Sequence, residues 1–149
     1  MEPHDLWRLE RQYRAQGLEL ICGADEAGAG PLAGDVYAAA VILPFELTPE
    51  GLNDSKQVSP KNRDRLFDLI REQAVAWAVA SVDAATIDEI NILNARLLAM
   101  DRAIQALTPQ PQFALIDGNR DKGIPCPHIA VVKGDSVSAN IAAASILAK

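Results

Sequence analysis

The sequence predicts a mixed α/β fold in a single domain, residues 1–149. Three observations support this prediction. A length of 149 residues suits one domain, and 49% hydrophobic residues are typical of a globular chain rather than a disordered one. Five short apolar runs have the length of strands. Longer segments with helical spacing of apolar residues lie among them, in an order that is typical of a mixed α/β protein.

The N-terminal part of the chain predicts a helix followed by a hairpin. Residues 5–17 place apolar side chains at helical spacing and stop at a glycine. Residues 18–25 are apolar and partly alternating, which indicates a strand that ends at Asp25. Residues 36–44 form a second apolar run closed by proline. Because a glycine-rich turn separates the two runs, we expect them to form a hairpin.

The central part predicts two helices around a third strand. Ser59 as N-cap and Pro60 at the first helical position begin one helix. Residues 76–83 alternate weakly and predict a strand. The next helix has Asn91 as a candidate cap and stops near Pro109. Its single apolar stripe consists of Leu93, Leu97, Met100, Ile104 and Leu107.

The last third predicts two more strands and a helix. Residues 112–119 are an apolar run that enters an Asp-Gly turn at Asp117. Residues 128–135 predict the fifth strand. Residues 136–149 are rich in small side chains, which favour a helix that packs closely against its neighbours.

Charge and composition narrow the class of protein. The net charge of −6 argues against a nonspecific nucleic-acid binder, which usually carries a basic stripe. It does not exclude an enzyme whose acids hold metal ions. Cys22 and Cys126 form no metal-binding pattern and are expected as free thiols. Without a signal-peptide pattern or an apolar run of bilayer length, we expect a soluble cytoplasmic protein with no membrane contact.

Two adjacent acids, Asp25 and Glu26, precede a run of glycines at positions 28, 30 and 34. A dinucleotide-binding loop would need the spacing G-x-G-x-x-G and a helix after it, and the sequence offers neither. A solvated turn, in which the glycines adopt positive φ, is a second interpretation. A metal site is the third.

The metal interpretation depends on two strand ends. Asp25 ends one predicted strand and Asp117 ends another, so their carboxylates share one edge of the sheet if the strands are parallel neighbours. Mg²⁺ and Mn²⁺ prefer oxygen ligands of this kind. Adjacent residues on a regular strand face opposite ways. We therefore expect Glu26 to join the site only if the strand has ended and the chain is turning.

Two further runs suit a phosphate-bearing partner. Residues 53–56 offer an amide, a hydroxyl and an ammonium group on a predicted loop. Residues 133–136 precede a helix whose N-terminal amides could hold a phosphate. The same Lys-Gly-Asp-Ser run is also common as a capped helix start, so both interpretations stay open.

Five motifs occur in the order found in one known family. They are GADEAGAGPLAGDVYAAAVILP, LNDSKQVS, INILNARLLAM, LIDGN and VVKGDSVSANIAAASILAK. Through them the chain resembles bacterial ribonuclease HII. The resemblance implies an RNase H-like fold, in which helices flank a mixed central sheet. It also implies an endonuclease that cleaves the RNA strand of RNA–DNA hybrids and nicks duplex DNA on the 5′ side of an embedded ribonucleotide, leaving 3′-hydroxyl and 5′-phosphate ends.

The resemblance implies roles for individual residues. Asp25 and Glu26 match the family's first two acids, and Asp117 matches the acid of its Asp-Gly-Asn turn. These three would be the catalytic residues and would hold two Mg²⁺ or Mn²⁺ ions. The candidate substrate contacts are Gly28, Ala29, Gly30, Asn53, Ser55, Lys56, Lys133, Gly134, Asp135, Ser138 and Asn140.

The chain departs from the family pattern at several positions. Ala29 stands where the family has Arg in a Gly-Arg-Gly turn, and Arg96 stands where it usually has Thr. The family's fourth acid and C-terminal region would follow Lys149. We therefore expect weaker ion binding and substrate contact than in the full pattern. The alternative is a non-catalytic module of the same fold, which binds a hybrid duplex or a protein partner. A monomer is expected.

Overall fold

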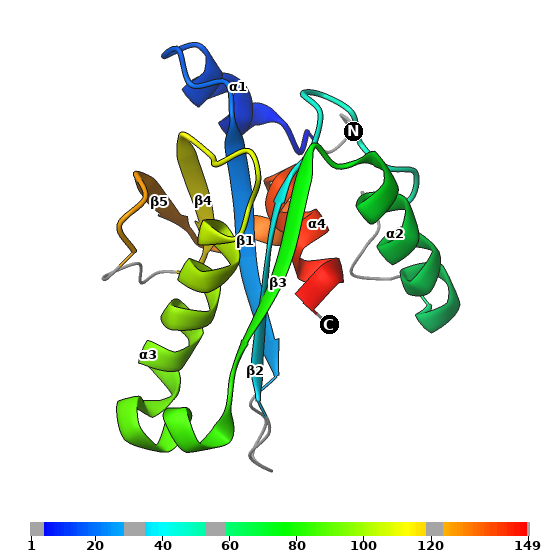
Figure 1. Ribbon diagram of the computed structural model, residues 1–149. Helices are drawn as coiled ribbons and strands as arrows, with labels where there is room; N and C mark the ends of the chain where they lie inside the picture. The colour runs from blue at the N-terminus through cyan, green and yellow to red at the C-terminus, as the bar shows by residue number, and fades with distance from the viewer. Residues whose placement is uncertain (1–4, 29–34, 53–58, 119–123, 149) are drawn as a thin grey trace.

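The computed structural model describes residues 5–28, 35–52, 59–118 and 124–148. At its centre lies a five-stranded sheet with the order β3-β2-β1-β4-β5 (Figure 1). The strands are β1 (Ile21–Gly28), β2 (Val36–Ile42), β3 (Ala76–Val82), β4 (Phe113–Asp117) and β5 (His128–Val131). β2 pairs antiparallel with both β1 and β3, whereas β4 pairs parallel with both β1 and β5. The predicted mixed sheet and the β1–β2 hairpin pairing are both confirmed.

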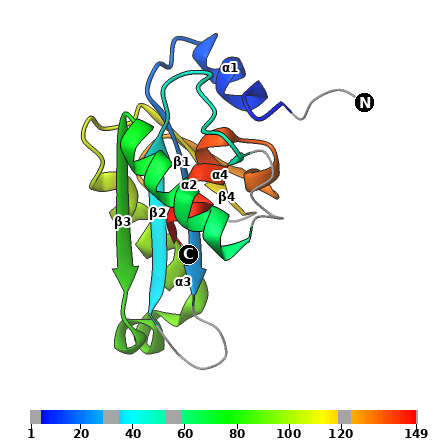
Figure 2. The same cartoon turned by 90° about the vertical axis from the view of Figure 1, so that its right-hand side faces the viewer.

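Helices cover both faces of this sheet. They are α1 (Arg8–Arg14), α2 (Pro60–Gln73), α3 (Ala84–Gln105) and α4 (Ala139–Ala148), with a short 3-10 helix, η2 (Gly134–Ser136). Figure 2 shows α2 in front of the sheet and α3 behind it. In the described residues, one apolar cluster lies under α3 and a second under α2 and α4, and a smaller third one contains Ile21, Leu115 and Ile141. None of the helices in the described ranges is long and apolar enough to cross a bilayer.

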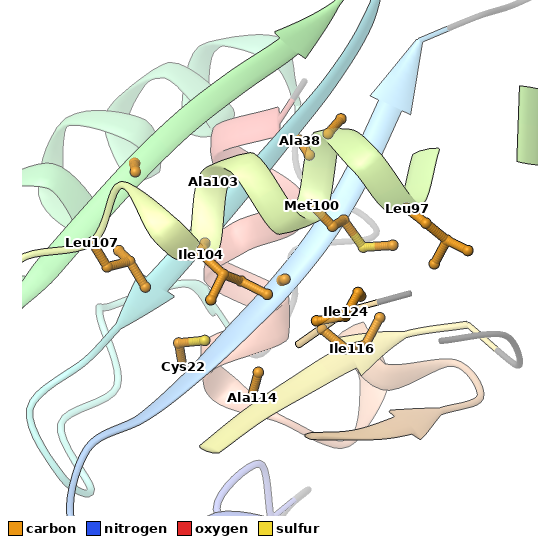
Figure 3. Close-up of a cluster of buried hydrophobic side chains, with 14 of the residues drawn as sticks. Cys22, Ala38, Leu97, Met100, Ala103, Ile104, Leu107, Ala114, Ile116 and Ile124 are labelled. Atoms are coloured by element: carbon orange, nitrogen blue, oxygen red, sulfur yellow. The ribbon is translucent and has the colours of Figure 1, made fainter. Parts of the chain in front are cut away.

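Strand alternation decides which face each side chain joins. On β1, Cys22 and Ala24 are buried under α3, and Ala114 and Ile116 of β4 join them there (Figure 3). The intervening residues of both strands point to the α4 face. This division matters at Asp25 of β1 and at Asp117, the last residue of β4.

Local signals explain where the helices begin. The Ser59 hydroxyl accepts a hydrogen bond from the Asn62 N–H, so the predicted cap of α2 is confirmed. Asn91 also acts as a cap, since its Oδ1 accepts from the Asn94 N–H at 3.0 Å. The prediction that the helix starts there was incomplete. Asp83 caps an earlier segment, and Asn91, at φ 66°, marks a kink between the two parts of α3.

α4 packs unusually close to the sheet. A Cβ atom added to Gly23 of β1 would lie 2.2 Å from the Ile141 nitrogen. All residues of α4 are buried, and most of them are small. The predicted close packing is confirmed, although α4 begins at Ala139 and η2 occupies the preceding residues.

Candidate active site

Asp25 and Asp117 lie on two neighbouring strands, at the level where β4 ends. β1 and β4 are parallel, and Ala24 pairs with Ile116, immediately before the two acids. The condition for the prediction that both carboxylates emerge at one edge of the sheet, a parallel pairing of their strands, is therefore confirmed. Leu115 belongs to the cluster that contains Ile141 of α4, so alternation places the side chain of Asp117 on that face as well.

The two carboxyl groups are close enough to interact, and Asp25 is buried while Asp117 is half-buried. Asp25 is only 7% exposed, and its Oδ1 accepts a hydrogen bond from the Glu26 N–H at 2.8 Å. Burial raises the pKa of Asp25 far above its usual range, and the charge of Asp117 and a hydrogen bond with it raise it further. A carboxyl pair of this kind carries an electrostatic cost that a bound cation would remove.

The backbone of Gly134 positions the second acid. The Gly134 N–H donates to Asp117 Oδ1 at 2.7 Å. A Cβ atom at position 134 would lie 2.5 Å from Ile141 Cδ1 and 3.1 Å from Asp117 Oδ1. Only glycine fits this contact without displacement of its neighbours. The amide of Gly134 therefore serves the acid rather than a free phosphate.

The prediction that the first strand ends at Asp25 is wrong, and this changes the position of Glu26. β1 does not end at Asp25 but continues to Gly28, and Glu26 pairs with Ala38 of β2. Because the strand stays regular, Glu26 faces α3, opposite to Asp25. There its Oε1 lies 3.7 Å from the Nε of Arg96. Burial raises the pKa of Glu26, while the charge of Arg96 opposes this effect and that of Asp117 adds to it.

The arrangement fits a hard divalent cation in part. Carboxylate oxygens are the ligands that Mg²⁺ and Mn²⁺ prefer, and Asp25 and Asp117 offer them from one face. In the part of the chain that the structure describes, no three His, Cys, Asp or Glu side chains form a group that could hold an ion. The third predicted ligand, Glu26, is instead directed at Arg96.

The remaining candidate contacts have different surroundings. Lys133 is exposed beside η2, where it adopts a left-handed backbone at φ 55°. Asp135 lies within η2 and is partly buried. Gly28 is the last residue of β1 and pairs with Val36. The other candidates lie outside the described residues: Ala29, Gly30, Asn53, Ser55 and Lys56.

Ser138 and Asn140 require a correction. Both are buried, and their polar groups bind to other parts of the protein. The Ser138 hydroxyl donates to Glu10 Oε2 at 2.7 Å, and the Asn140 side-chain amide donates to the same oxygen at 2.9 Å. Asn140 Oδ1 accepts from the Leu43 N–H at 2.7 Å. We therefore no longer regard these two residues as candidate substrate contacts.

Glu10 is a buried polar residue that was not predicted from the sequence. This glutamate is 1% exposed and joins α1 to the start of α4. A signal for its burial exists, because Glu10 follows Leu6 by four residues and therefore lies on the same helix face. A charged residue within an apolar helical stripe indicates a buried polar contact.

The fold itself indicates a class of protein. The fold is shared with an enzyme of known structure. Ribonuclease H2 of Pyrococcus horikoshii superposes with a TM-score of 0.74 at 26% identity, over 87% of this chain and 70% of that one. The predicted RNase H-like fold is confirmed.

The family is shown by sequence. The family model described as Ribonuclease HII matches residues 22–149, and the chain belongs to this family. It is 58% identical to ribonuclease HII of Dechloromonas aromatica over 130 residues, which cover 87% of this chain and 66% of that protein. It is 59% identical to ribonuclease HII of Bacteroides fragilis over 133 residues, which cover 88% and 66%. The chain thus spans about two thirds of the length of these relatives.

Proposed function

We propose that this chain belongs to an endonuclease of the ribonuclease H type, which hydrolyses the RNA strand of RNA–DNA hybrids. The same site would nick duplex DNA on the 5′ side of an embedded ribonucleotide, leaving a 3′-hydroxyl and a 5′-phosphate. The observation that carries the proposal is the placement of Asp25 and Asp117 side by side at the sheet edge, in a chain of the ribonuclease HII family.

The three acids have distinct tasks in this proposal. Asp25 and Asp117 would hold two Mg²⁺ or Mn²⁺ ions from the α4 face. Glu26 lies near enough for the charge of Asp117 to raise its pKa, and it would add its carboxylate by leaving Arg96. Such ions, when bound, supply Lewis-acid activation of water and neutralise charge at the scissile phosphate. Gly134 holds the Asp117 carboxylate in one orientation through its N–H. Burial of Asp25 limits its contact with water and strengthens its attraction for cations.

Substrate recognition requires donors around this edge. Lys133 is exposed one residue before Gly134, which suits a contact with a phosphate oxygen. Asp135 would lie close enough to contact the ribose. The turn of Gly28, Ala29 and Gly30 would offer backbone amides to the ribose. A 2′-hydroxyl is the group that distinguishes RNA from DNA at such a site. The loop candidates are Asn53, Ser55 and Lys56.

The proposed substrates suggest where the protein acts and in which processes. We propose a monomer that acts in the cytoplasm on hybrid duplexes and on duplex DNA with embedded ribonucleotides. There it would serve ribonucleotide excision repair and DNA replication. Because the chain carries a net charge of −6, its acids would need cations before a polyanionic duplex could approach.

One observation favours a second candidate function. Glu26 forms an ion pair with Arg96 of α3. A protein that keeps this pairing could bind a hybrid duplex or a protein partner without cleaving it. The two functions differ in one measurable product, a nicked strand.

The test is cleavage of an end-labelled DNA duplex that contains one ribonucleotide, with Mn²⁺ or Mg²⁺ present. We expect a single nick on the 5′ side of the ribonucleotide, no nick in an all-DNA duplex, and none after chelation. Asp25→Asn should abolish the nick. If this duplex and an RNA–DNA hybrid both stay intact with either metal, the proposed activity is wrong. Duplex binding without cleavage would support the second candidate.

A further inference from the structure

Arg96 lies at the edge of the candidate site without being one of its acids. Its Nε is 3.7 Å from Glu26 Oε1, and the two side chains are 43% and 21% exposed. The pair therefore sits between solvent and the protein interior. Arg96 approaches from α3, on the face of the sheet opposite to Asp25 and Asp117.

The helix holds this guanidinium in place. Asn91 caps the second part of α3 one turn before Arg96. The neighbours of Arg96 in sequence, Ala95 and Leu97, are buried against the sheet. Arg96 therefore emerges from an anchored turn rather than from a loop, and its position relative to Glu26 is set by the core.

We propose that Arg96 is a positioning residue that sets the metal affinity of the site by competing with divalent cations for Glu26. The inference rests on the proposed function, because it assumes that Glu26 contributes to ion binding. An ion that uses Glu26 must displace the guanidinium or share the carboxylate with it. In either case the two positive charges repel one another.

The ion pair is weak enough for a divalent ion to displace the guanidinium. Both side chains are partly exposed, so water screens the attraction between their charges. Arg96 thus weakens ion binding without preventing it, and it holds Glu26 toward α3 until an ion arrives.

Calorimetric titration with Mn²⁺ tests this inference through binding rather than activity. Arg96→Gln keeps a long, helix-favouring side chain and removes the charge. We expect it to bind Mn²⁺ roughly three- to tenfold more tightly than the unchanged protein. Arg96→Lys keeps the charge and should restore nearly the original affinity. Unchanged or weaker binding by a folded Arg96→Gln protein would overturn the inference.

The matched control is Arg102→Gln on the same helix. Arg102 is an arginine whose Nη1 donates to the Ser81 carbonyl at 3.0 Å, on β3 rather than at the acids. We expect its replacement to leave the Mn²⁺ affinity within about twofold, because this guanidinium is bound to β3 rather than to Glu26. An equal gain in Mn²⁺ affinity for Arg96→Gln and Arg102→Gln would mean that the affinity depends only on the net charge of the protein. That result would overturn the specific role of Arg96.

A double variant shows whether Arg96 acts through Glu26. In Glu26→Gln, the affinity gain from Arg96→Gln should shrink, because the competition acts through the lost carboxylate. A gain of the same size in that background would show that Arg96 does not act through Glu26. If no variant binds Mn²⁺, the proposed metal site fails and this inference fails with it. If all bind equally, only the inference fails.

Discussion

Glu10 is a buried carboxyl group whose two oxygens have unequal surroundings. Oε2 accepts from the Ser138 hydroxyl and from both nitrogens of Asn140, whereas Oε1 is buried without a hydrogen-bond partner. A cavity of about 20 Å³ lies beside Glu10 and is lined by Trp7, Leu43 and Asn140, which is enough room for one water molecule. Burial raises the pKa of Glu10.

This raised pKa predicts how stability changes with pH. In the range between the ordinary and the raised value, the folded protein holds a proton that the unfolded chain has lost. The contribution of Glu10 is therefore fully present below the ordinary glutamate pKa of 4.5 and is lost as the pH rises through the higher folded value. Glu10→Gln removes this loss, because glutamine has the shape of the protonated acid.

We therefore expect Glu10→Gln to match the unchanged protein near pH 4 and to exceed its stability near pH 8. Urea unfolding across this range measures the difference. Glu72→Gln, at an exposed position of α2, should show no such divergence. Parallel pH profiles for Glu10→Gln and the unchanged protein would contradict the account of this residue.

Asp25 is a second buried acid, and here a neighbouring acid adds to the effect of burial. Its pKa is raised by burial and by a like charge, so the folded apo protein bears an electrostatic cost at neutral pH. Sites that bind cations commonly carry such strain, because the ion repays it. Arg96 and Glu26, by contrast, compensate each other's charge in the absence of an ion.

At the scale of elements, the contact between β1 and α4 positions the candidate site. Gly23 allows the first turn of α4 to approach the strand two residues before Asp25. The same turn holds Ile141 against Gly134, which in turn orients Asp117. The alignment of the two acids thus depends on how closely one helix lies on one strand.

Gly23→Ala should separate these elements. The added Cβ atom would meet backbone atoms of α4, including the Ile141 nitrogen at 2.2 Å, and backbone cannot move as a side chain does. We expect a loss of about 1 to 3 kcal/mol in the free energy of unfolding, the range for overpacked cores. Thermal and urea unfolding measure this loss.

Gly17→Ala provides the reference for that experiment. At position 17 a Cβ atom would meet nothing within 4 Å, but φ is +95°, so only the backbone penalty remains. That penalty is roughly 1 to 2 kcal/mol. If Gly23→Ala costs less than Gly17→Ala, the close approach of α4 to β1 does not constrain the fold as described.

At the scale of the whole molecule, much of the fold was predictable from the sequence. Apolar runs bounded by glycine and proline located all five strands, and Ser59 and Asn91 marked helix caps. The sequence predicted that Asp25 and Asp117 would lie at one edge of the sheet if their strands were parallel neighbours, and the pairing of β1 with β4 confirms that condition. These successes share a cause, since each depends on local pattern or on a rule of sheet topology.

The failures depend on tertiary contacts. β1 extends past Asp25 because β2 supplies backbone partners as far as Gly28, although glycine disfavours strands. For the same reason Glu26 points to α3, where Arg96 meets it. The burial of Ser138 and Asn140 could not be inferred either, because it depends on Glu10, 128 positions away from Ser138 in the chain.

The central claim is that Asp25 and Asp117 together bind a divalent cation. Calorimetric titration of the chelator-treated protein with Mn²⁺ tests it most directly, with Asp25→Asn and Asp117→Asn as isosteric variants and Asp68→Asn on the exposed face of α2 as control. We predict binding by the unchanged protein and by Asp68→Asn, and a loss of at least about tenfold in affinity for each site variant. Undiminished Mn²⁺ binding by both site variants would contradict the claim.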